Sequence, residues 1–167
     1  GAGQGGPTGP QGRSEQVYSV MDAAFVTPRE ETAALAIEAI ADELDIFDDW
    51  MERYQYIIEM GRKLPPFPTQ WCDDAHRVPG CQSQVWLQEQ QEGDRLYFAG
   101  SSDAAIVCGL VALLLRVYSG RTRAEIEATD PTFLSDLGLV QALSSNRGNG
   151  VQAMAHAIRS AAAVMAG

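Results

Sequence analysis

Three cysteines are the residues of this chain most able to do covalent chemistry, and they lie far apart, at Cys72, Cys81 and Cys108. An odd number of cysteines argues against the paired disulfide framework of a secreted protein. A reducing cytoplasm is therefore the expected compartment, and each thiol has to be judged by its own neighbours.

Cys81 has the neighbours that best suit a reactive thiol. Pro79 and Gly80 precede it, which indicates an irregular loop, and the glycine permits close backbone approach and loop movement. The three residues that follow are neutral hydrogen-bonding ones, so no negative charge stands next to the sulfur. Such a site suits a thiol that must meet a sulfur atom of another protein, although the pattern alone leaves an ordinary loop cysteine open.

The other two cysteines have simpler explanations. Cys72 follows Trp71 and precedes two aspartates, whose charge raises a thiol pKa and disfavours the thiolate, so we interpret it as a bystander. Cys108 lies inside an apolar stretch, where a cysteine usually acts as a small hydrophobic residue.

Two further chemistries use the same residues. Cys72, His76 and Cys81, with Asp73 or Asp74, could form a zinc site, but the closely spaced cysteine pairs of structural zinc sites are missing. A cysteine hydrolase would need His76 and Asp103 beside a thiol, yet no nucleophile signature is present. Neither a P-loop nor a dinucleotide-binding glycine motif occurs.

Composition excludes several partners. The chain has 167 residues, of which 46% are hydrophobic, and a formal net charge of -10, which disfavours nucleic acids and anionic lipid surfaces. No apolar run approaches the roughly 18–20 residues that a membrane span needs. Most of the acidity lies in residues 22–49, which hold nine acidic residues and one basic residue, Arg29. We interpret this segment as a solvated helix face, with a docking face for a basic partner as the alternative.

Helices are predicted before the cysteine loop. Residues 1–12 are rich in glycine and cannot form a core. Thr27 and Pro28 predict the start of a first helix. Asp48 or Asp49 can cap a second helix that Gly61 ends, and an irregular loop over residues 65–80 follows.

A hairpin and more helices are predicted after that loop. Alternating residues from Val85 and a turn at residues 92–94 indicate two antiparallel strands that end at Gly100. Residues 101–103 then cap an apolar, buried helix over residues 104–118. Capping signals begin short helices at Thr122 and Asp130, and Asn149-Gly150 precedes a last one. This order predicts an α+β fold with a small antiparallel β-sheet packed against helices.

Four ordered blocks of the chain resemble the SufE family of sulfur acceptors. The first three are residues 50–65, residues 100–110 and the octet Gly80-Cys81-Gln82-Ser83-Gln84-Val85-Trp86-Leu87. The fourth is Arg147, Asn149 and Gly150 with Met154. Together they span about residues 47–162, and four blocks at compatible spacing are far more specific than one cysteine motif.

The resemblance implies an activity and partners. SufE proteins share an α+β fold similar to that of the iron–sulfur scaffold IscU, take persulfide sulfur from a cysteine desulfurase of the SufS or CsdA type, and pass it to a SufBCD scaffold. The chain itself would bind no cofactor, because the pyridoxal phosphate belongs to the desulfurase. It would stimulate that enzyme rather than act alone, and a homodimer stays open. A zinc-binding or non-catalytic docking module is the alternative.

The resemblance also implies roles for single residues. The acceptor cysteine corresponds to Cys81, and loop-supporting or partner-docking positions correspond to Gly80, Gln82, Gln84, Asp103 and Arg147. Gly148 departs from the family pattern, which has serine after the arginine. No Lys, Arg or His is adjacent to Cys81, so we expect the partner to help form the thiolate. We also expect the resting loop to turn Cys81 toward the hairpin and the apolar helix.

The predicted domain organisation has two parts. Residues 1–26 form a low-complexity or weakly ordered N-terminal segment, and residues 27–167 form the SufE-like domain. The first 44 or so residues have no clear counterpart in a minimal family member.

Overall fold

The computed structural model describes residues 22–142 and 145–166; the side chains of residues 22 and 141–149 lie outside that description. Its helices are α2 (Ala33–Asp45), α3 (Trp50–Arg62), α4 (Ala105–Tyr118), α5 (Arg123–Ala128), α6 (Phe133–Asp136), α7 (Leu139–Ala142) and α8 (Ser145–Ala163). Its strands are β1 (Val85–Glu92), β2 (Arg95–Ser102) and β3 (Arg121–Thr122), and single 3₁₀ turns cover Asp22–Ala24, Thr69–Trp71 and Asp74–His76. The predicted α+β class is confirmed.

The sheet is a hairpin with one short extra strand. β1 and β2 pair antiparallel from Val85 opposite Ser102 to Glu92 opposite Arg95, and the strand order is β1-β2-β3. Gly93 makes the connecting turn with a positive φ of 60°, which glycine adopts without strain. The hairpin is therefore where the sequence predicts it, with β2 running two residues beyond Gly100.

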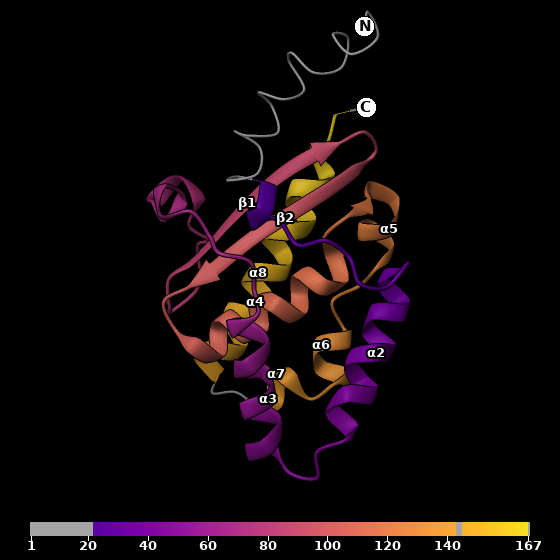
Figure 1. The fold of residues 1–167 in the computed structure, drawn as a ribbon, viewed down its shortest axis with the longest axis vertical. Helices are drawn as coiled ribbons and strands as arrows, with labels where there is room; N and C mark the ends of the chain where they lie inside the picture. The colour runs from indigo at the N-terminus through magenta and orange to yellow at the C-terminus, as the bar shows by residue number, and fades with distance from the viewer. Residues whose placement is uncertain (1–21, 143–144, 167) are drawn as a thin grey trace, which may run out of the picture.

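Helix α4 forms the centre of the hydrophobic core. Nearly all its residues from Ile106 to Tyr118 are buried, because the helix lies between the sheet, α2, α3 and α8. Figure 1 shows the sheet at one end of the molecule with α4 and α8 behind it, and α2, α3, α6 and α7 toward the other end. Gly120 follows α4 with a φ of 78° and ends the helix as predicted.

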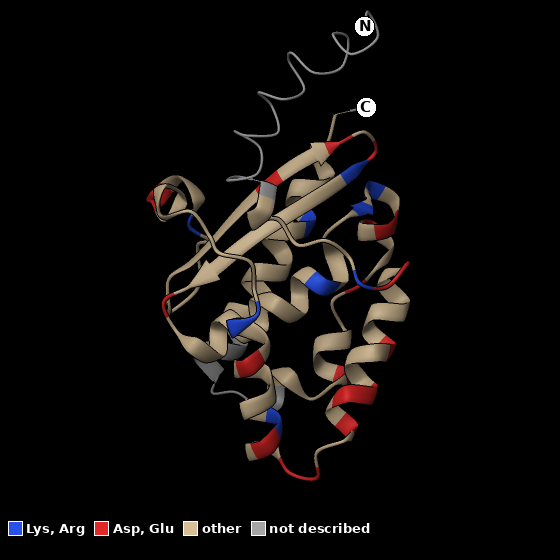
Figure 2. Cartoon of the chain, in the orientation of Figure 1, with Lys and Arg blue, Asp and Glu red and all other residues tan. Residues whose placement is uncertain are grey.

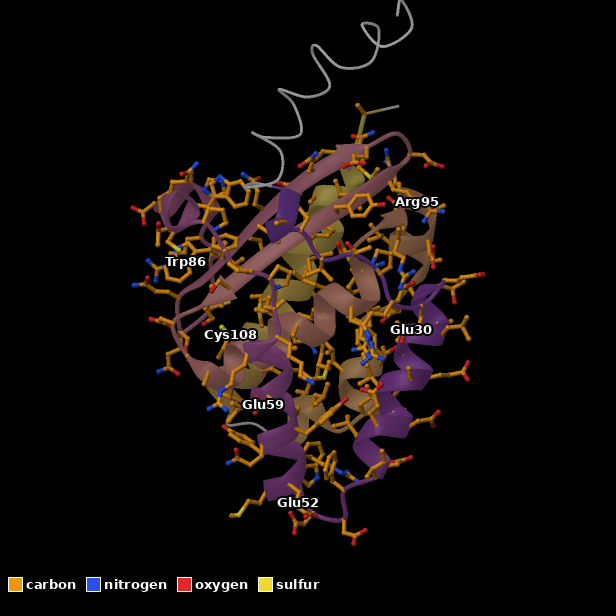
Figure 3. The ribbon with its side chains drawn as sticks, viewed as in Figure 1. Glu30, Glu52, Glu59, Trp86, Arg95 and Cys108 are labelled. Atoms are coloured by element: carbon orange, nitrogen blue, oxygen red, sulfur yellow. The ribbon has the colours of Figure 1, made fainter. Side chains whose placement is uncertain are left out.

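Helices α3 and α4 touch at two glycines. A Cβ on Gly61 would lie 2.6 Å from the Gly109 nitrogen, and a Cβ on Gly109 would lie 2.2 Å from the Ile57 carbonyl oxygen. The prediction that Gly61 ends its helix is wrong, since α3 continues to Arg62 and the glycine serves the close helix contact. Figure 3 shows Cys108 at this crossing.

The first helix begins later than predicted. Thr32, rather than Thr27, is the N-cap of α2, and its hydroxyl accepts a hydrogen bond from the Leu35 nitrogen. The residues before it form irregular backbone with bends instead of a helix, and the Val26 nitrogen donates to the Phe98 carbonyl at 2.8 Å. Pairing with β2 therefore prevails over the local capping signal at Thr27. Asp49 caps α3 as predicted.

The last helix begins earlier than predicted. Helix α8 starts at Ser145, so Gly150 lies inside it rather than before it. Gly150 is buried, and a Cβ there would lie 3.8 Å from the Cys81 sulfur, so the glycine faces the cysteine loop. The Thr122 cap of α5 is where the sequence predicts it.

The acidic segment is mainly a solvated surface. Figure 2 shows acidic residues along α2 and the connection to α3. Six of its carboxylates are on exposed residues: Glu31, Glu38, Asp42, Asp45, Asp48 and Asp49. Glu30 and Glu43 differ, because both pair with Arg116 of α4.

Residues 22–26 of the predicted N-terminal segment pack on the domain, and Ala24 is buried there. Residues 1–21 of that segment lie outside the described residues. No helix in the described part of the chain is long and apolar enough to cross a membrane.

Candidate functional site

The Cys81 loop is closed at its base by the backbone. The Val78 nitrogen donates to the Val85 carbonyl at 2.8 Å, and Arg77 forms a bridge with Trp86 of β1. Residues 79–84 therefore form a short loop whose two ends are fixed to each other. Gly80 has a φ of 87° within it, a conformation that favours glycine over any residue with a side chain.

The end of the loop is clamped at Gln84. Its nitrogen donates to Asp103 Oδ1 at 3.0 Å, and its carbonyl accepts from the Ser102 hydroxyl at 2.7 Å and the Asp103 nitrogen at 3.2 Å. Asp103 does not cap α4, because the N-cap is Ala104. This contact is compatible with the loop-supporting role predicted for Asp103, which stays a prediction. Gln84 takes part through its backbone, while its side chain is exposed.

Cys81 itself turns inward and is partly buried. Its sulfur donates a weak hydrogen bond to the Gly150 carbonyl at 3.6 Å. A cavity of about 10 Å³ lies against it, with apolar walls from Val107 and Leu110 of α4 and Met154 of α8. The thiol thus faces the apolar helix as expected, but its other neighbour is α8, and no strand residue lines this cavity.

These surroundings favour the neutral thiol. Burial raises the pKa of Cys81, and the charge of Arg77 only partly opposes that rise. Arg77 is a further candidate functional residue, which the sequence near Cys81 does not reveal because it lies four positions before the cysteine. A cation four residues away becomes a neighbour once the loop is closed at its base.

The two other cysteines lie in different settings. Cys72 is exposed, and burial, followed by the charge of Asp73, raises its pKa. The Cys108 sulfur is partly buried and donates to the Ser102 carbonyl at 3.2 Å. Neither lines the Cys81 cavity.

The residues of the zinc alternative are not brought together. His76 lies with Nδ1 2.7 Å from Asp73 Oδ1 and Nε2 2.8 Å from the Gln88 amide. Among the described residues, no three His, Cys, Asp or Glu side chains form a group that could hold a metal ion.

The remaining predicted positions divide into two groups. Gly80 and Gln82 are exposed on the loop, where a partner could reach them, and Gln82 also lines the rim of the Cys81 cavity. Arg147 belongs to α8 by its backbone, but its side chain lies outside the described residues, so its predicted role stays a prediction.

The fold and this loop together define a class of protein: a small α+β domain that carries one thiol on a closed loop, in a narrow apolar recess between two helices. The protein-family model "SufE: Fe-S metabolism associated domain" matches residues 38–162. The chain belongs to the SufE family, and this domain gives it a role in iron–sulfur metabolism.

Relatives and solved structures agree with this assignment. An uncharacterized SufE-like protein of Rhizobium etli is 42% identical over 145 residues, which cover 83% of this chain and 98% of the relative. An uncharacterized SufE-like protein of Rhizobium meliloti is 40% identical over 132 residues, which cover 76% of this chain and 94% of that relative. The solution structure of a hypothetical protein from Thermus thermophilus has a TM-score of 0.64 at 19% identity and covers 77% of this chain and 93% of that one. This last likeness supports the fold alone.

Proposed function

We propose that this protein accepts persulfide sulfur from a cysteine desulfurase on Cys81 and passes it to an iron–sulfur cluster assembly scaffold. The observation that carries the proposal is the position of Cys81 on a clamped loop, with its sulfur in a recess rather than in solvent. The desulfurase would be of the SufS or CsdA type and the scaffold of the SufBCD type. The pyridoxal phosphate of the reaction belongs to the desulfurase.

The transfer is a thiol exchange at sulfur. The Cys81 thiolate attacks the outer sulfur of the cysteine persulfide on the desulfurase. A new sulfur–sulfur bond forms on Cys81, the bond to the desulfurase sulfur breaks, and the desulfurase thiolate leaves and takes a proton. No atom is oxidised or reduced overall, because one persulfide replaces another.

The resting loop has to open before this step can occur. The Cys81 sulfur faces Gly150 and the apolar residues of α4 and α8, so a bulky persulfide on another protein cannot approach it in line. Opening would move Cys81 away from its apolar walls and remove the desolvation that raises its thiol pKa. The desulfurase active site can then supply the positive charge or proton acceptor that favours the thiolate.

Closing the loop again would protect the product. The recess has room for about one water-sized sphere at most, and its walls are largely apolar. A terminal persulfide sulfur directed into it would be shielded from solvent thiols and oxidants until a scaffold opens the loop.

Mass spectrometry tests the proposal directly. The protein is incubated with a cysteine desulfurase and free cysteine, then digested without reductant. One added sulfur atom is expected on the Cys81 peptide, and none in Cys81→Ser. Cys72→Ser is the matched control, since it removes an exposed thiol and should leave the transfer intact.

Desulfurase turnover separates a sulfur acceptor from a docking module. We expect Cys81→Ser to lose the stimulation of sulfide release while still binding the desulfurase. Full stimulation by Cys81→Ser would overturn the acceptor role and leave a docking module.

A further inference from the structure

A second cavity lies on the other part of α4, away from the cysteine loop. It has a volume of about 320 Å³ and is lined by the segment before α2, by α2, by α3 with the residues that follow it, and by α4. Its α4 residues are Ala112 and Arg116, whereas those at Cys81 are Val107 and Leu110, and the two cavities share no lining residue. This volume lies at the lower end of the range of small-molecule sites.

The charged groups at the floor of this cavity are already paired. Arg116, whose side chain is 4% exposed, donates to Glu30 at 2.7 Å and to Glu43 at 2.8 Å. The Tyr56 hydroxyl also donates to Glu43. Glu30 lies beside the N-terminal end of α2 (Figure 3). The charged groups of the floor are therefore already paired with one another, so the floor gives a ligand a fixed shape and fixed dipoles.

The rim carries two further cations. Arg29 and Lys63 both line the cavity and are exposed, and neither forms an ion pair with a carboxylate among the described residues. The charged lining residues are thus three cations, Arg29, Lys63 and Arg116, and one carboxylate, Glu43. Counting Glu30 as well, which pairs with Arg116 but does not line the cavity, leaves an excess of one positive charge. The whole chain has a net charge of -10, which makes a locally positive cavity unusual for this molecule.

The rest of the wall is apolar. Val26, Met60, Leu64 and Ala112 contribute hydrocarbon or thioether surface beside the two rim cations. Apolar walls with a few convergent polar groups are typical of sites that bind small organic molecules.

The wall before α2 is fixed in place. The Val26 carbonyl accepts from the Ser119 hydroxyl at 2.6 Å, and the Glu30 carbonyl accepts from Arg121 Nη1 at 2.8 Å. Ser119 and Arg121 are buried, so these contacts hold the segment without solvent competition. A preformed wall lowers the entropy that a ligand must lose on binding.

We propose that this cavity binds a small organic anion with one acidic group and an apolar body. The acidic group, a carboxylate or sulfonate, lies between Arg29 and Lys63, and the apolar body lies against Met60, Leu64 and Ala112. The proposal is independent of sulfur transfer, because no residue of the Cys81 loop takes part.

Octanoate is a suitable probe, because it joins one carboxylate to an apolar chain. Binding is followed by calorimetry and by the methyl signals of the five methionines, labelled with carbon-13. We expect octanoate to shift the signal of Met60, which lines this cavity, and to leave that of Met154, which lines the Cys81 cavity. Octanamide, which lacks the charge, should bind at least about tenfold more weakly.

Substitution of the two rim cations tests their role. The double variant Arg29→Gln, Lys63→Gln should bind octanoate at least about tenfold more weakly. Because both residues are exposed, the variant should still fold. Arg62→Gln with Arg123→Gln is the matched control, since it changes the net charge equally at two exposed pairs outside the cavity. Cys81→Ser should bind octanoate unchanged.

Several outcomes would overturn the proposal. These are absence of a Met60 shift at millimolar octanoate, a shift at Met154 instead, equal affinity for octanamide, or equal losses in the rim and control variants. None of them bears on sulfur transfer at Cys81.

Discussion

At the scale of single residues, burial in the resting protein favours the neutral, less reactive form of the candidate acceptor thiol. The Cys81 sulfur is partly buried against α4 and α8, and this burial raises its thiol pKa. Only the thiolate attacks a persulfide, so the resting state disfavours reaction with stray electrophiles. Reactivity should then depend on the groups that hold or charge the loop, of which Arg77 and Asp103 are the clearest.

Alkylation should report the raised pKa of Cys81. In the isolated protein, its reaction with iodoacetamide should keep accelerating with pH beyond the midpoint of the unfolded chain, because folding favours the neutral thiol. Arg77→Gln should slow the reaction by about twofold near neutral pH, since a nearby exposed cation is removed. Rates are measured by peptide mass spectrometry, with Arg62→Gln as the control. A midpoint well below pH 7 would contradict the prediction.

Asp103→Asn should loosen the loop. The Gln84 nitrogen would then donate to a neutral amide oxygen instead of a carboxylate, which weakens the contact by about 1 kcal/mol, and the amides of residues 78–84 should exchange faster with solvent. Hydrogen-exchange mass spectrometry measures this. Asp130→Asn, at another exposed turn, is the control. Unchanged exchange over the loop would show that Asp103 does not hold it.

At the scale of elements, the position of the cysteine loop depends on how helices pack around α4. Helix α3 approaches α4 closely because Gly61 and Gly109 lack side chains at the crossing. Helix α8 approaches the loop at Gly150, which places a carbonyl opposite the Cys81 sulfur. Glycines inside three helices therefore set the geometry of the site, and two of them are needed for steric reasons.

Gly109→Ala should destabilise the fold strongly. The new methyl group would overlap the Ile57 carbonyl, and such overpacking costs at least about 2 kcal/mol when backbone must move. Gly150→Ala is the matched control, because its methyl group would make only ordinary contacts and alanine is the better helix former. Urea unfolding compares the two. Equal stability of both variants would rule out the close helix contact.

At the scale of the whole molecule, residues 22–37, which precede the family-matched region, are part of the folded domain. Val26 extends the hydrogen bonding of β2, and Glu30 reaches Arg116 across 86 positions of sequence. The pKa of Glu43 is lowered to about 2, first by its hydrogen bond from Arg116. The pKa of Glu30 is lowered by the same guanidinium. The acidic segment therefore contributes to stability as well as to surface charge.

Acid should weaken this contribution. Because the folded pKa of Glu43 lies below its ordinary value of 4.5, the stabilisation is present above about pH 4.5 and is lost as the pH falls toward 2. The free energy of unfolding of Glu43→Gln should be about 1–3 kcal/mol lower than that of the wild type at neutral pH. It should then decrease less steeply as the pH falls. Urea unfolding at several pH values measures this, with exposed Glu38→Gln as the control. Parallel curves of unfolding free energy against pH for the wild type and Glu43→Gln would contradict the prediction.

Much of the local structure could be predicted from the sequence. The hairpin and its turn at Gly93, the buried helix α4, and the caps at Asp49 and Thr122 all depend on residues a few positions apart. The helix starts at Thr32 and Ser145 could not be predicted in this way. The contact of Val26 with β2 prevails over the capping signal at Thr27, and α8 continues through Asn149 and Gly150 although this pair is a local signal for a helix start. Gly61 resembles a helix end in the sequence alone, and only its contact with α4 explains why a glycine is needed there.

The same division applies to the site. The sequence by itself determined which thiol stands out and on what kind of loop, because residue type and local spacing limit both. Only the tertiary structure decided what surrounds that thiol: the Gly150 carbonyl lies 69 residues away in sequence from Cys81, and the apolar walls come from α4 and α8. Such contacts depend on how helices pack, and packing is set by side chains that meet only after the chain has folded.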